Sequence, residues 1–237
     1  MKWSKENLRL LYQEKFALEF SDDELEFVWR KSKDNNITPT GDRMNIAGTP
    51  MFIRNTIQLS LERSNLSPGD NRLKKMKEEL MPAIDFALFL KKIGFGEHLI
   101  CLSDSPDIIL VKKDGYKAKS HGGHGVMAIP LEVTFVKDSS WAEASGSTSA
   151  EKLINILSKK LTRSYSKHTT LLVVIDALIA NINLEELNFL LQEKGKNFHH
   201  IYVYANVGDD LYMMARVYPD WDTLTLSATK DLEPLMY

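Results

Sequence analysis

The stretch IPLEVTFVKD, residues 129–138, places one carboxylate inside a run of apolar and β-branched residues. Such a run predicts a strand with a buried face. Glu132 stands in its middle, and a glutamate on a buried strand is costly unless something pairs with it. A metal ion is one such partner, whereas a glutamate at a water-facing sheet edge needs none. The interpretation of the chain depends on which environment Glu132 has.

Short runs rich in Ile, Val, Leu, Tyr and Thr follow one another from His98 onward and predict strands. They are HLICL (98–102), DIILVKK (107–113), VMAIPLEVTFV (126–136), TTLLVVIDAL (169–178), HHIYVYANV (199–207) and LYMMARVYP (211–219). The first three have short connections, which favours an antiparallel meander. Helices are predicted before and after the fourth run, and a strand–helix–strand order implies a right-handed parallel crossover. We therefore expect an α/β fold with a mixed sheet flanked by helices.

Helix signals dominate the first part of the chain and recur between the later strands. Ser21 with Glu24, and Thr148 with Glu151, have the spacing of a capping box. After Thr148, an apolar stripe recurs at helical spacing, formed by Ala150, Leu153, Leu157 and Leu161. We divide the chain into a helical N-terminal region, residues 1–74, and an α/β core, residues 75–237.

Composition limits the function. The chain has 237 residues, 43% of them hydrophobic, and a net charge of -2, so it can bury a full core but has no global basic character. No apolar run approaches the roughly 20 residues that span a bilayer. Cys101 is the single cysteine and the N-terminal segment has no signal-peptide core. These features predict a cytoplasmic protein with no membrane partner.

Two carboxylates stand on predicted strands. Asp107 follows a proline at the start of the second strand, and Glu132 lies near the middle of the third. If the two strands pair as a hairpin, both carboxylates can converge on one face. Mg²⁺ takes one or two protein carboxylates and keeps waters for substrate phosphates, and the carbonyl of Val133 could add an oxygen.

The sequence PD, then about two dozen residues, then a glutamate on a β-branched strand, resembles the PD-(D/E)XK phosphodiesterase superfamily, the restriction-endonuclease-like proteins. The order of elements from about Lys75 to Val207 also resembles its αβββαβ core. The resemblance implies a nuclease that hydrolyses DNA with Mg²⁺ or Mn²⁺ held by Asp107 and Glu132. In that family a lysine two residues after the glutamate assists the attacking water. Thr134 stands there in this chain.

A lysine on the following helix could replace the missing one, as in some members of the superfamily. Lys152, Lys159 and Arg163 share roughly one helix face, opposite the apolar stripe. We assign Lys152 as the first candidate, Lys159 as the second, and Arg163 to substrate binding. The family's metal site is sometimes completed from the preceding helix, where Asp85 is the candidate beside Glu79.

Two loops could contact substrate. HGGHGV (121–126) has too few ligands for a closed zinc site, but His124 or His121 could contact a phosphate. SSWAEASGSTS (139–149) carries Trp141, which could stack on a base or pack on the sheet edge. The expected partner is DNA, and a two-fold homodimer would suit cleavage of both strands.

Each of these residues also has a structural interpretation. Glu132 could be a half-exposed strand residue, Asp107 an ordinary turn aspartate, and the lysine face of the helix simply solvated. On that interpretation the chain is a catalytically inactive nuclease-fold module, with Thr134 marking the lost lysine, that binds nucleic acid or a protein partner. Whether the chain is an enzyme therefore stays open at the level of the sequence.

Overall fold

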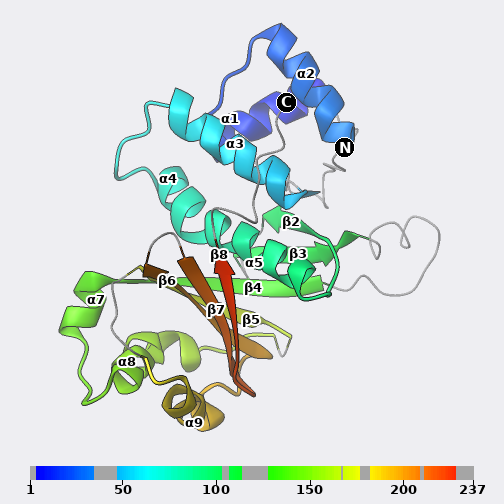
Figure 1. Cartoon of the computed structure of the whole chain (residues 1–237). Coiled ribbons are helices and arrows are strands. Elements are labelled where there is room, and N and C mark those ends of the chain that lie inside the picture. Colours follow the sequence, from blue (N-terminus) through cyan, green and yellow to red (C-terminus); the bar gives the residue numbers. More distant parts are fainter. Residues whose placement is uncertain are drawn as a thin grey trace. The chain divides into compact units, whose positions relative to one another are not determined.

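The computed structural model describes residues 4–34, 47–102, 107–113, 128–166, 168–176, 182–208 and 211–227. The chain forms two compact units, residues 1–129 and residues 130–237 (Figure 1). The fold is mixed α/β, with a mixed sheet flanked by helices, as expected. The domain boundary placed between residues 74 and 75 stays a prediction.

The N-terminal unit is mostly helical. Its helices are α1 (Lys5–Phe16), α2 (Asp22–Asp34), α3 (Pro50–Arg63), α4 (Asn71–Lys75), the π-helix η1 (Met76–Leu80) and α5 (Met81–Lys92). Strand β2 (His98–Leu102) pairs antiparallel with both β1 (Ala47–Gly48) and β3 (Ile108–Lys112). The predicted antiparallel pairing of the first two runs, 98–102 and 107–113, is thus confirmed. The core of this unit comes from apolar residues such as Leu11, Ile57 and Phe86, which are at most 1% exposed.

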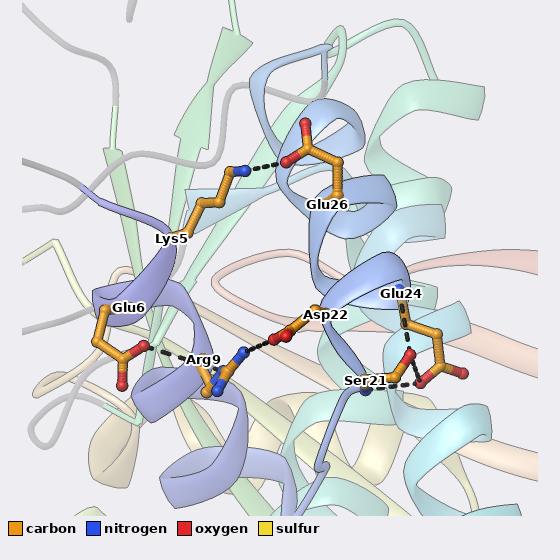
Figure 2. Close-up of polar contacts among 7 residues, drawn as sticks. All are labelled: Lys5, Glu6, Arg9, Ser21, Asp22, Glu24 and Glu26. Carbon is orange, nitrogen blue, oxygen red and sulfur yellow. Dashed lines mark hydrogen bonds and ion pairs between the residues drawn. The ribbon is translucent and has the colours of Figure 1, made fainter.

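Ion pairs link α1 to α2 (Figure 2). Lys5 pairs with Glu26, and Arg9 Nη2 lies 2.6 Å from Asp22 Oδ1. The four side chains are more than a third exposed, and exposed pairs of this kind each contribute about 0–1 kcal/mol. The apolar contacts beneath them therefore carry most of the packing between the two helices.

The capping box predicted at the start of α2 is present. The backbone N–H of Ser21 donates to Glu24 Oε2 at 3.0 Å, and the N–H of Glu24 donates to Ser21 Oγ at 3.3 Å (Figure 2). Arg63 also donates to Glu24, and this hydrogen bond is the main reason that the pKa of that carboxyl is lowered.

The C-terminal unit contains β4 (Ala128–Lys137) from Pro130 onward, and the strands β5 (Thr170–Asp176), β6 (His200–Gly208), β7 (Leu211–Tyr218) and β8 (Asp222–Ser227). Neighbours in the chain are neighbours in the sheet. The pairs β4–β5 and β5–β6 are parallel, and β6–β7 and β7–β8 are antiparallel. The parallel crossovers expected from the strand–helix–strand pattern are therefore confirmed.

Helices α8 (Ser149–Leu161) and α9 (Leu184–Lys194) make these two crossovers and lie along one face of the strands, with the short α7 (Asp138–Glu143) before α8 (Figure 1). The predicted apolar stripe of α8 is buried and packs with Val136, Val173 and Val203 from three adjacent strands. Because β4 and β5 are parallel, α8 must run in the opposite direction to both. Its last turn therefore lies level with the beginning of β4.

The predicted capping box of α8 is also present. Glu151 N donates to Thr148 Oγ1 at 3.2 Å, while Thr148 Oγ1 donates to Glu186 of α9 at 2.7 Å. One hydroxyl thus both caps α8 and joins it to α9.

We expect Thr148→Ala to lower the free energy of unfolding by about 1–2 kcal/mol, because an N-cap acceptor is lost. Thr148→Ser retains the hydroxyl and should lie within about 0.5 kcal/mol of the wild type. Urea denaturation followed by circular dichroism measures both. Equal losses in the two variants would contradict a capping role for the hydroxyl.

Candidate functional site

Glu132 lies on β4 and is 4% exposed, so its side chain is buried and does not lie at a water-facing edge of the sheet. Side chains alternate along a strand, so Glu132 shares a face with Thr134 and Val136. Val136 belongs to the core beneath α8 and α9. The carboxylate therefore points into the layer between the sheet and these helices.

Two donors meet on one oxygen of this carboxylate. Lys160, in the last turn of α8, pairs with Glu132 Oε1, and Tyr165 donates its hydroxyl to the same oxygen at 3.1 Å. Burial raises the pKa of Tyr165, so its hydroxyl stays protonated at neutral pH. Glu132 Oε2 makes no hydrogen bond within the described residues. The buried charge is thus matched on one side and open on the other.

The direction of α8 explains why Lys160 is the lysine at Glu132. Lys152 is eight residues earlier, or about 12 Å back along the helix axis at roughly 1.5 Å per residue. Four strand residues cover about the same length at roughly 3.3 Å each, so Lys152 lies level with Val136. Lys159 is exposed on α8. Lys160 is the lysine that the sequence interpretation missed.

A signal for Lys160 was nevertheless present in the sequence. It follows Leu157 by three positions and directly precedes Leu161, and both leucines are at most 3% exposed. Lys160 therefore stands at the margin of the buried stripe, whereas Lys152, Lys159 and Arg163 were selected for lying opposite it. A basic residue at that margin, in the last turn of a crossover helix, can reach the beginning of the preceding strand.

Thr134, two residues after Glu132, has a hydroxyl buried within this layer. Its Oγ1 has no hydrogen-bond partner among the described residues. A buried hydroxyl without a partner costs about 1–3 kcal/mol. The strand therefore carries a buried hydroxyl without a partner, among the described residues, on the same face as the Glu132 carboxylate.

Arg163 and Tyr165 continue the site beyond the end of α8. The guanidinium of Arg163 lies 5.9 Å from the centre of the Tyr165 ring, and that ring lies 4.8 Å from the ring of Phe198. Phe198 is 3% exposed, so it anchors Tyr165 to the core. Tyr165 is thereby held between a cation at the surface and the buried carboxylate.

The predicted metal ligands outside β4 lie in the N-terminal unit. Asp107 directly precedes β3 and is half-buried. Its convergence with Glu132 on one metal ion stays a prediction. Asp85, on α5, pairs with Arg54 of α3 at 2.5 Å, and both side chains are less than a fifth exposed. The carboxylate of Asp85 is therefore matched by a cation within its own unit.

The remaining predicted site residues have varied positions. Val133 is buried on β4, on the face opposite Glu132. Trp141, on α7, packs against the core beneath α8, and its stacking on a base stays a prediction. His124 lies outside the described residues.

Within the described ranges, no group of three or more His, Cys, Asp or Glu residues is arranged to hold a metal ion. The same part of the chain has no helix that is long and apolar enough to cross a membrane. Comparisons with protein-family models, with curated proteins and with solved structures found no significant match.

We expect Lys160→Met to lower the free energy of unfolding by about 3 kcal/mol, since it leaves a buried carboxylate without its cation. Lys159→Met, one residue away and exposed, should change it by less than about 0.5 kcal/mol. The double variant Glu132→Gln/Lys160→Met should recover most of the loss, because no charge remains buried. Denaturant titration of these variants and of Glu132→Gln alone measures the coupling free energy; additive single effects would contradict a direct interaction between Glu132 and Lys160.

Proposed function

We propose that this chain is a divalent-metal-dependent nuclease that hydrolyses DNA phosphodiester bonds, with a restriction-endonuclease-like core. The observation that carries the proposal is the lysine of the crossover helix on the buried glutamate of β4. The resemblance implies a glutamate and a lysine held together on one face of the sheet. Because Thr134 stands where the family has that lysine, the sequence alone does not identify the lysine of this chain. Lys160 now takes the place for which Lys152 and Lys159 were the candidates.

The residues present suit a hard divalent cation such as Mg²⁺ or Mn²⁺. Glu132 Oε2 is open within the described residues, and such ions need only one or two protein carboxylates. Asp107 is the proposed second ligand. When bound, the ion lowers the pKa of an attacking water and offsets charge on the scissile phosphate.

The side chains around Glu132 have distinct proposed roles. Tyr165 fixes Oε1 and so sets the direction of Oε2, because the carboxylate is planar. Lys160 has a flexible stem, which allows its ammonium to move from Oε1 to a phosphate oxygen on which charge develops. Thr134 carries no charge and cannot do this. Arg163 is the proposed contact to the substrate backbone beside the site.

A catalytically inactive binding module is the second candidate. The observation that favours it is the same pair, since an internal cation already matches the charge of Glu132. In this case the pair stabilises the fold, and the protein retains binding to nucleic acid or to a protein partner. For either function we propose a cytoplasmic protein, and for the nuclease a homodimer that presents two sites to the two strands of a duplex.

Incubation of plasmid and single-stranded DNA with the protein in Mg²⁺ or Mn²⁺ tests the nuclease. We expect cleavage by the wild type, a loss of at least about 100-fold in rate with Lys160→Met, and similar losses with Glu132→Gln and Asp107→Asn. Lys159→Met is the matched control and should retain activity. The assay is run at a temperature at which all variants are folded by circular dichroism.

Cleavage that survives both carboxylate substitutions would contradict the proposed site. DNA retarded on a gel but cut by none of the forms would favour the binding module.

A further inference from the structure

Two segments of the C-terminal unit are basic in a chain whose net charge is slightly negative. They are KKLTRSYSKH (159–168), which begins in the last turn of α8 and continues past its end, and KGKNFHH (194–200), which runs from the end of α9 to the start of β6. No Asp or Glu occurs in residues 152–175 or 194–208. Positive charge is thus concentrated in two short segments that precede neighbouring strands.

The fold brings these segments together. The N–H of His199 donates to the carbonyl of Thr169 at 2.8 Å, and Asn197 Nδ2 donates to the carbonyl of Leu161 at 2.8 Å. The contact between the Tyr165 and Phe198 rings joins them a third time. Both segments therefore form one surface, at the end of the sheet where β5 and β6 begin.

Four exposed basic side chains of these segments lie beyond the ends of α8 and α9, and we refer to them as the basic edge: Arg163, His168, Lys196 and His199. None of them pairs with a carboxylate in the described part of the chain. The arginines of the N-terminal unit differ, because each of the following pairs with a carboxylate: Arg9, Arg30, Arg54, Arg63 and Arg72. The full charges of Arg163 and Lys196 are therefore available to an external anion.

Favourable interaction with helix C-termini does not account for the basic edge. Lysines already occupy the last turns of both helices, Lys159 and Lys160 in α8 and Lys194 in α9. Arg163 instead lies over Tyr165. His200 is adjacent but does not add charge at neutral pH, because burial, then His199 and Arg216, lower its pKa to about 4.

We propose that the basic edge binds the phosphate backbone of nucleic acid. Phosphates are neutralised by Lys and Arg that lack internal partners, and an aromatic ring beneath Arg163 fixes its position. Tyr165 connects this edge to Glu132, so a bound backbone passes beside the candidate site. The choice of nucleic acid among polyanions rests on the proposed function, but binding does not require cleavage.

The test compares the affinity of two variants for a short fluorescein-labelled DNA duplex by fluorescence anisotropy, without divalent metal. Arg163→Gln/Lys196→Gln/His199→Gln replaces three of the four side chains of the basic edge, including both that carry a full charge. Lys91→Gln/Lys113→Gln removes two full charges from the N-terminal unit, where both lysines pair with Glu97. Both sets change side chains on the surface, and circular dichroism confirms folding.

We expect the triple variant to bind at least about 10-fold more weakly at 100 mM salt, and its log–log salt slope between about 50 and 200 mM to fall by about 2 units, as for two lost phosphate contacts. The control should match the wild type. An unchanged slope in the triple variant would overturn the proposal. Equal affinity for heparin and DNA at matched charge would overturn the assignment to nucleic acid.

The cleavage assay separates this inference from the proposed function. If the triple variant loses affinity for DNA, while Lys160→Met still binds DNA but no longer cleaves it, binding at the basic edge and cleavage at Glu132 are separable and both proposals stand. If Lys160→Met abolishes cleavage while the triple variant binds normally, the nuclease stands and the basic edge is wrong.

Discussion

The buried carboxylate of Glu132 is the constraint on which the C-terminal unit depends. A charge that is 4% exposed on a central segment of β4 must be matched, and the nearest element that can supply a cation is the crossover helix. This requirement fixes the level of the last turn of α8 relative to β4. It also fixes the path of the chain after α8, because Tyr165 must return to the same oxygen.

A buried ion pair is by itself weak evidence that the pair stabilises the fold. Replacing such a pair with well-packed apolar side chains is often neutral or stabilising by about 1–4 kcal/mol, because both charges must be desolvated. Here the cost is greater, since the neighbouring buried hydroxyl of Thr134 lacks a partner among the described residues. A fold that needed only a filled layer would be served better by apolar side chains. Polar groups left open beside a charge pair are more typical of a site that accepts a ligand.

The sequence was sufficient for features that depend on local periodicity. Both capping boxes, the buried stripe of α8 and the parallel crossovers followed from spacing alone. The identity of the lysine did not, because helix periodicity shows which face a residue occupies but not its height along the strand. The position of a helix residue along the strand follows only when two facts are combined. These are the direction in which the helix runs and the length that each residue covers in a helix and in a strand. The meeting of Asp107 with Glu132 depends on pairing between distant segments, which no local pattern determines.

Tyr165 makes the two parts of the C-terminal edge interdependent. Its ring packs on Phe198, its hydroxyl holds Glu132, and its outer face carries Arg163. Arg163 packs on Tyr165, the side chain that orients the Glu132 carboxylate. A phosphate bound by Arg163 can therefore alter the position of that carboxylate without contacting it. The loops that join α8 to β5 and α9 to β6 thus do more than connect elements. They place the guanidinium of Arg163 against the ring of Tyr165, whose hydroxyl binds the buried carboxylate of Glu132. The packing of the core does not require this arrangement.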